Sequence, residues 1–158
     1  MKKYELTDET LTIGSITLHR VKALVAFTGV EVGETGGWVE KEANLDQSGD
    51  AWVYGDARVY GDAWVSGENH HLAIGPIGSR DDTITFTRNK KGGIFASVGC
   101  FFGTLAEFRE KVSDTHGGNV HAQAYLMAAQ LAELRIDTTP IADTQEEPTD
   151  GCEKGNAT

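Results

Sequence analysis

A repeat of six residues in the first half of the chain constrains the fold more than any other feature of the sequence. Three consecutive copies follow the pattern Gly-Asp-Ala-x-Val-x, over residues 49–54, 55–60 and 61–66. Weaker copies precede them at Gly37-Trp38-Val39 and Ala43-Asn44-Leu45. Near-identical copies at a fixed short period are typical of chains that wind into stacked coils.

Each six-residue unit is interpreted as a corner followed by a short strand. Glycine accepts a positive φ at the corner, and the aspartate side chain bonds backbone amides there. The alanine and the valine lie two positions apart, so both side chains point inward while the residue between them points outward. Residues 37–69 are therefore predicted to form a short hexapeptide-repeat β-solenoid, with Val53, Val59 and Val65 inside.

The segments around the repeats predict three further units and a mainly β fold. Residues 1–36 alternate apolar and polar side chains around a Gly14-Ser15 turn and are predicted to form an N-terminal β cap of hairpins. Residues 70–136 are predicted to form a small α+β module of two strands and two helices. Residues 137–158 hold six acidic residues and one basic residue, which predicts a disordered acidic tail.

The two strands and the two helices of the 70–136 module have clear sequence signals. Residues 83–87 and 94–98 read as strands joined by a hairpin turn. A Thr104–Glu107 capping box opens the first helix, and Asn119 caps the second. The predicted buried stripe of the first helix is Leu105, Phe108 and Val112, and that of the second is Ala124, Met127, Ala128, Leu131 and Leu134.

Aromatic side chains follow the inward-facing positions of the repeats, at Trp52, Tyr60 and Trp64. Exposed aromatic rings are costly unless another surface covers them. Three kinds of cover remain open: the chain's own cap or C-terminal module, a second copy, and a stacked ligand. These three residues are assigned to an oligomer interface, and the protein is expected to be a homo-oligomer, either a trimer or a dimer.

The turn before the 83–87 strand combines groups that suit a phosphate. Glycine lets backbone amides approach an anion, hydroxyls donate to it, and Arg80 can grip it bidentately. Thr83 and Thr85 share one face of their strand. The alternative is a structural turn in which Arg80 pairs with a neighbouring aspartate. The predicted ligand-binding residues are Ser79, Arg80, Thr83, Thr85, His116 and His121.

Other chemistries lack sequence support. No His-x-His or Cys-x-x-Cys spacing favours a metal site, and neither catalytic residues nor a cofactor are predicted. Cys100 lies in an apolar Gly-Cys-Phe-Phe run and is expected to be buried. A net charge of −10 argues against nucleic acid. No apolar run approaches the ~20 residues of a membrane span, and two cysteines fit a reducing cytoplasm.

Together, the motifs along residues 1–136 resemble a family of small proteins encoded by bacteriophages and prophages. The resemblance implies an accessory rather than virion-structural protein that acts in the host bacterial cytoplasm and antagonises host defence. The motifs that carry the resemblance are Val53–Arg58, Ile74–Phe86, Lys90–Gly93, Gly99–Phe108, His116-Gly117 with His121, and Gly36-Gly37-Trp38-Val39.

Three functions of different classes follow from these observations. The first is a non-enzymatic binding protein that sequesters an anionic nucleotide signal, cyclic or otherwise phosphorylated, or binds a host defence protein. The second is an acyltransferase, by analogy with hexapeptide-repeat enzymes that use a histidine base, here His70 or His71. The third is a structural, self-assembling protein. The absence of a convincing catalytic set favours the first.

Overall fold

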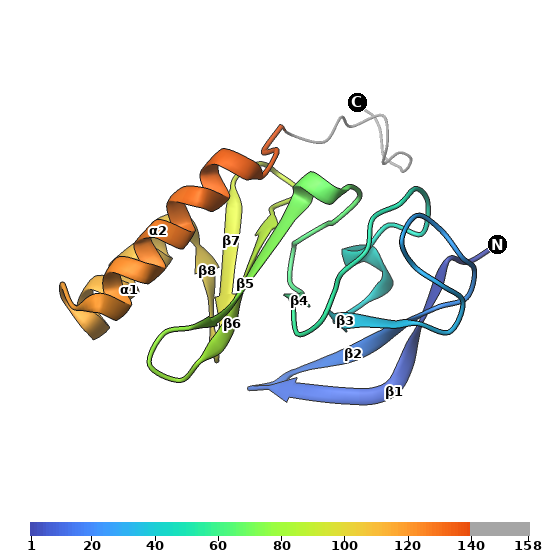
Figure 1. Cartoon of the computed structure of the whole chain (residues 1–158), viewed down its shortest axis with the longest axis horizontal. Helices are drawn as coiled ribbons and strands as arrows, with labels where there is room; N and C mark the ends of the chain where they lie inside the picture. Colours follow the sequence, from blue (N-terminus) through green and yellow to red (C-terminus); the bar gives the residue numbers. More distant parts are fainter. Residues whose placement is uncertain (140–158) are drawn as a thin grey trace, which may run out of the picture.

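The computed structural model describes residues 1–139, and these fold into two four-stranded sheets and a pair of helices (Figure 1). Residues 140–158, most of the predicted acidic tail, lie outside the described residues. The first sheet has the order β1(Tyr4–Ile13), β2(Ile16–Ala23), β3(Thr35–Val39) and β4(Arg58–Val59). The second has the order β5(His71–Ile77), β6(Asp82–Arg88), β7(Ile94–Val98) and β8(Phe101–Thr104), and it is followed by α1(Leu105–His116) and α2(Val120–Arg135).

The predicted N-terminal hairpin is confirmed by the pairing of β1 and β2. The two strands are antiparallel, and Ile13 lies opposite Ile16 across the Gly14-Ser15 turn. Gly14 has a φ of 59°, which a side chain would resist. Strand β2 then pairs with β3. The inner face of this sheet supplies Tyr4 and Val21 to the hydrophobic core of the N-terminal half, called the first core, whereas the second core lies between the second sheet and the helices.

The predicted solenoid is wrong, because the fold is α+β and its strands belong to two conventional sheets. Residues 37–69 contribute the end of β3, the two-residue β4, two short 3₁₀ helices (Glu42–Asn44 and Glu68–His70) and connecting loops. Parallel pairing joins Val39 to Val59, and one isolated bridge joins Leu45 to Val65. The repeats are too few to stack further coils on one another, so an antiparallel hairpin and the second sheet cover them instead.

Two parts of the prediction for each six-residue unit are nevertheless confirmed, the inward apolar pair and the glycine corner, whereas the predicted strand is wrong for the units outside β4. Val53, Val59 and Val65 are completely buried, and the alanines two positions before them are almost so. Gly49, Gly55 and Gly61 all adopt a positive φ at the corners. The repeat therefore places one apolar pair per unit in the first core, even though it does not form a regular strand in each unit.

The second sheet lies between the helices and the first half of the chain (Figure 1). Strands β6 and β7 match the two predicted strands, whereas β5 and β8 at its edges were not predicted. Ile84 and Phe86 face the helices and join the second core. Thr85 faces the other way, and its hydroxyl accepts a 3.0 Å hydrogen bond from the Arg58 backbone N–H.

The chain's own segments cover the aromatic residues assigned to an oligomer interface. Trp52 is 2% exposed and packs edge-on against Tyr4 and Phe27. Tyr60 is 1% exposed, and its ring centroid lies 4.5 Å from that of Phe102. Its hydroxyl accepts a hydrogen bond from Ser97 of β7. The half-buried Trp64 lies under the guanidinium of Arg88. Packing against the cap and the C-terminal module, the first of the three alternatives, accounts for these rings.

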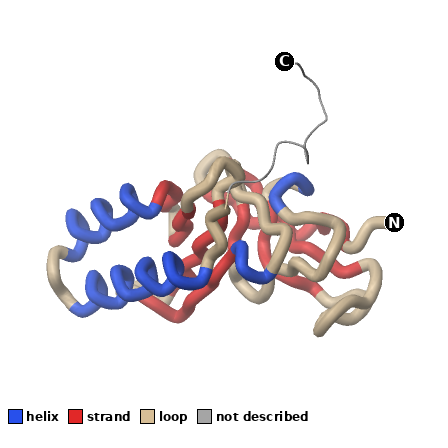
Figure 2. The backbone as a smooth tube through the Cα atoms, turned by 90° about the horizontal axis from the view of Figure 1, so that it is seen from above, coloured by secondary structure: helices blue, strands red, loops and turns tan. Residues whose placement is uncertain are grey.

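Both helix starts are confirmed, but the predicted buried face of α2 is wrong. Thr104 and Glu107 form the capping box of α1, and the Asn119 side chain accepts from the Ala122 N–H. Figure 2 shows the two helices side by side as an antiparallel pair. Helix α1 buries its predicted stripe, whereas α2 buries Ala122, Tyr125, Ala128, Ala129 and Ala132. Only Ala128 belongs to the stripe predicted for α2.

Candidate functional site

A cavity of about 220 Å³ lies between the β5–β6 turn, the β7–β8 turn and the two helices. Its polar lining comes from both turns and from the C-terminal half of α1, and its apolar lining comes from the second core. The residues around it are Ser79, Arg80, Asp82, Val98, Gly99, Cys100, Phe101, Phe108, Lys111, Val112, Thr115, His116 and Tyr125.

The charged groups of this cavity are mainly cationic. Arg80 and Lys111 carry two positive charges against the single carboxylate of Asp82. Arg80 is exposed and makes no ion pair within residues 1–139. Arg80 therefore does not lock the turn through an ion pair with a neighbouring aspartate, which was the alternative to a ligand-binding role. This local excess of positive charge occurs in a chain whose net charge is −10.

Aromatic rings form the apolar wall. The Phe108 ring stands perpendicular to Tyr125, with ring centroids 5.7 Å apart, and lies 5.9 Å from the Phe101 ring. Burial raises the pKa of Tyr125, and the nearby Asp82 adds to the rise while Arg80 opposes it. The tyrosine hydroxyl is therefore a neutral donor and acceptor at physiological pH, which adds a polar group to an apolar wall.

Gly78 holds the β5–β6 turn against this wall. Its φ of 80° favours glycine, and a Cβ at this position would collide with the Tyr125 hydroxyl. The turn can approach α2 only because residue 78 lacks a side chain. The next two residues, Ser79 and Arg80, are thereby brought to the mouth of the cavity.

The structure brings together four of the six predicted ligand-binding residues. Ser79, Arg80 and His116 line the cavity, and the centroid of the His121 ring lies 5.8 Å from that of His116. Thr83 and Thr85 do not line the cavity, because they alternate with the helix-facing residues of β6. Thr85 is buried against Arg58 instead. The ligand-binding role of all six remains a prediction.

Sequence reasoning missed Lys111, Phe101 and Tyr125 at this site. Lys111 lies one helical turn from Phe108 and Thr115, but nothing local indicates which turn of the chain that helix meets. Cys100, expected to be buried, is exposed. It occupies the two-residue turn between β7 and β8, where the tight reversal points it outward at the rim.

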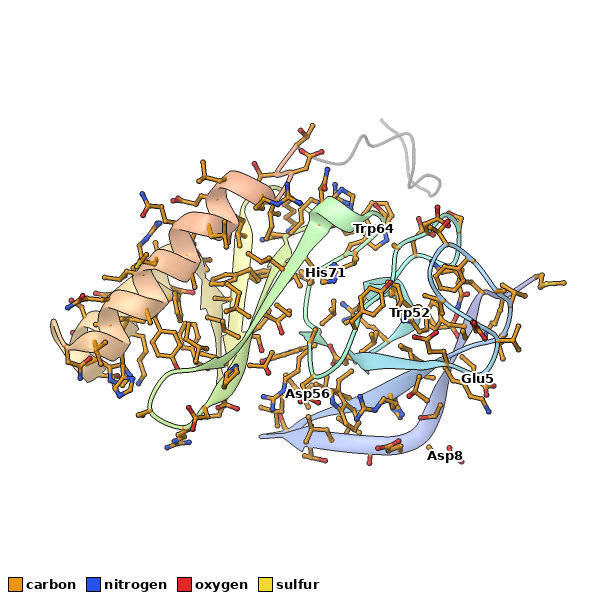
Figure 3. All side chains as sticks on the ribbon, viewed as in Figure 1. Glu5, Asp8, Trp52, Asp56, Trp64 and His71 are labelled. Carbon is orange, nitrogen blue, oxygen red and sulfur yellow. The ribbon has the colours of Figure 1, made fainter. Side chains whose placement is uncertain are left out.

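A second cavity, of about 370 Å³, lies where the repeats meet strand β5. Trp52 and His71 both line it and are labelled in Figure 3. Among the side chains that the structure describes, neither the Trp52 Nε1 nor the His71 Nδ1 has a hydrogen-bond partner. Burial, assisted by neighbouring His70, lowers the pKa of His71 to about 4.

Two kinds of feature are absent from the described part of the chain. Among the described side chains of residues 1–139, which leave out that of Glu68, no three His, Cys, Asp or Glu gather closely enough to hold a metal ion. In the same part of the chain, no helix has both the length and the apolar character needed to cross a bilayer.

Comparison with known proteins gives one partial similarity. An uncharacterized acetyltransferase of Escherichia coli (strain K12), YdcK, is 32% identical over 62 residues, which cover 34% of this chain and 19% of that protein. The match thus spans about a fifth of the length of that relative. No family model matches the chain, and no solved structure shows significant similarity to it.

Proposed function

We propose that this chain is a binding protein that captures a small anionic molecule in the cavity beside the helices. The observation that carries the proposal is the convergence of Arg80 and Lys111 on one cavity of an otherwise acidic chain. Arginine binds phosphate oxygens bidentately and lysine binds them as a point charge. Ser79 and Thr115 add hydroxyl donors at the same mouth.

The wall of the cavity selects for a second property of the ligand. Phe101, Phe108 and Tyr125 offer ring surfaces, so the favoured ligand joins its anionic group to a flat or apolar part. A nucleotide has both parts. The cavity of about 220 Å³ is smaller than most small-molecule sites, so the rest of such a ligand would extend into solvent.

Sequestration of a nucleotide signal is the role that fits this chemistry within the phage setting implied by the sequence motifs. A protein that binds such a signal without converting it would lower its free concentration by mass action. The residues of the cavity support an anionic ligand with a flat part, and antagonism of host defence would follow if that ligand is a signal of the host.

Titration calorimetry against a panel of ligands tests the proposal. The panel holds adenosine, AMP, cyclic mononucleotides, cyclic dinucleotides and inorganic phosphate. We expect the phosphorylated nucleotides to bind and adenosine to fail. Arg80→Ala should weaken binding by roughly ten- to a hundredfold, since a charge-assisted hydrogen bond contributes about 1.5–3 kcal/mol. Lys111→Ala should weaken it in the same direction.

Lys91→Ala is the matched control. This lysine is also exposed, but it lies in the β6–β7 turn and does not line the cavity. It removes the same charge from the whole chain, so it reports any effect of overall charge. Equal weakening by Lys91→Ala and Lys111→Ala, or failure of all the anionic ligands to bind, would contradict the proposal.

Acetyl transfer is the second candidate, and the similarity to a protein named as an acetyltransferase favours it. The histidines near the repeats support it poorly. Burial lowers the pKa of His71 to about 4, which makes it a weak base, whereas a general base works best when its pKa lies near the operating pH. The Nδ1 of His70 is engaged with Ser66. Turnover of acetyl-coenzyme A by the wild type, lost in His71→Gln, would reverse the order of the two candidates.

A further inference from the structure

Helix α2 carries a row of large apolar side chains on its outer surface. Met127 is 70% exposed, Leu131 is 43% exposed and Leu134 is 80% exposed. Val120 is also exposed, and Ala124 is half-buried. Scattered exposed apolar residues are ordinary, but a continuous row along one helix is typical of an interaction surface. We call Val120, Ala124, Met127, Leu131 and Leu134 the outer seam.

The two faces of α2 are inverted relative to an ordinary surface helix. Its inner face consists mainly of alanines, at 122, 128, 129 and 132, whereas the larger aliphatic side chains point outward. Burial of a leucine or methionine stabilises far more than burial of an alanine. A helix that is apolar on both faces is typical of one that is buried on both faces.

The spacing of the outer seam specifies what would cover it. Successive members lie four, three, four and three residues apart, over the whole 16-residue helix. This alternation places every member on one narrow stripe, and it is the spacing at which two helices interlock their side chains. The matching surface is therefore another helix with the same spacing.

Among residues 1–139, no other helix offers such a row. Residues 140–158 contain one large aliphatic residue, Ile141, among mostly polar and acidic ones. Helix α1 already packs beside α2, and its exposed side chains include the charged Glu110 and Asp114. A second copy of α2, by contrast, always brings the complementary seam.

An antiparallel pairing of two α2 helices fits the order of side chains. With Met127 at the twofold axis, Val120 meets Leu134 of the second copy, and the small Ala124 meets the large Leu131. The only Asp, Glu, Lys or Arg residues of α2 are Glu133 and Arg135, in its last turn. Antiparallel pairing separates each of them from its counterpart on the second copy, by about 18 Å along the axis for Glu133 and about 24 Å for Arg135 at 1.5 Å per residue.

We propose that the protein forms a twofold dimer through the outer seam of α2. The proposal is independent of the ligand, because Tyr125 and the cavity lie on the inner side of the same helix. It also relocates the expected self-association from the repeat aromatics, which the chain covers, to a surface that it leaves open.

Light scattering after size exclusion, over a dilution series in the micromolar range, tests the dimer. The wild type should have twice the mass of one 17.0 kDa chain. Leu131→Glu should reduce the mass to that of one chain. Leu126→Glu is the matched control, because Leu126 lies on the same helix with nearly the same exposure, 40%, but outside the seam. It should leave the dimer intact.

Cysteine cross-linking tests the geometry. With Cys100 and Cys152 replaced by serine, Met127→Cys should form a disulfide-linked dimer under mild oxidation, whereas Leu126→Cys should not. Circular dichroism confirms that each variant is folded. A wild type that stays at the mass of one chain throughout, equal dissociation by Leu131→Glu and Leu126→Glu, or equal cross-linking at 126 and 127 would each overturn the proposal.

Discussion

The Ser97 hydroxyl on β7 donates a 2.9 Å hydrogen bond to the hydroxyl of Tyr60, in the second six-residue unit. Both side chains are buried, with exposures of 3% and 1%. The bond crosses the interface between the repeats and the second sheet, where Thr85 also bonds the Arg58 backbone. These two polar contacts join the two halves of the chain.

Removal of both partners of this bond should destabilise the protein little more than removal of one. Tyr60→Phe leaves the Ser97 hydroxyl buried without its partner, which should lower the free energy of unfolding by about 1–3 kcal/mol. Adding Ser97→Ala should then cost little more, because no orphaned hydroxyl remains. Urea unfolding of both single variants and the double variant measures this coupling. Strictly additive losses would show that the bond is not formed in solution.

Substitution of Val59 by aspartate should abolish cooperative folding. Val59 is completely buried where β4 pairs with β3, and an unpaired buried charge costs several kcal/mol. Tyr54→Asp adds the same charge at a residue that is 54% exposed in the same repeat region, and it should leave the melting temperature nearly unchanged. Melting curves by circular dichroism compare the two. A wild-type curve for Val59→Asp would refute the inward assignment.

Gly78→Ala should destabilise the chain more than Gly14→Ala does. Both glycines have a positive φ, which costs a side-chain-bearing residue about 1–2 kcal/mol. At Gly14 the added Cβ meets nothing, whereas at Gly78 it collides with the Tyr125 hydroxyl. Tyr125→Phe should therefore restore part of the loss in the Gly78→Ala background. Denaturant unfolding gives all four values, and equal losses at the two glycines would argue against the close approach of turn and helix.

Acidification should weaken the fold partly through His71. Its pKa is about 4 in the folded protein against the usual 6.5. Between these values the unfolded chain binds the extra proton, so stability falls as the pH falls through this window. From pH 7.5 to pH 5 the loss attributable to His71 is about 2 kcal/mol, at 1.36 kcal/mol per pKa unit. Urea midpoints of wild type and His71→Phe at both pH values isolate it, because other groups contribute equally to both proteins. Parallel pH dependence would contradict the burial of His71.

Local features of this chain could be predicted from the sequence, and long-range ones could not. The capping box at Thr104 and the inward valines follow from residue type and spacing alone. The prediction for α2 failed because its sequence carries two apolar faces, and spacing does not say which one the monomer buries. The larger side chains lie on the outer seam, so a prediction from side-chain size favours the wrong face.

The site was predictable only in part for a similar reason. Ser79 and Arg80 stood out because their chemistry lies within one turn of the chain. Lys111 and Tyr125 reach the same cavity from helices about thirty and forty-five positions further along. Their meeting depends on Gly78, whose importance lies in a contact with a distant residue rather than in its local pattern.

The interleaving of the two halves also bears on synthesis of the chain. Tyr60 is covered in part by Ser97 of β7 and Phe102 of β8, which are synthesised after it. Until the ribosome has added these later strands, the Tyr60 ring of the nascent N-terminal half is exposed. An exposed aromatic ring favours contact with other nascent chains or with a chaperone. We therefore expect a fragment that ends between residues 60 and 97 to aggregate and not to fold as an independent small domain.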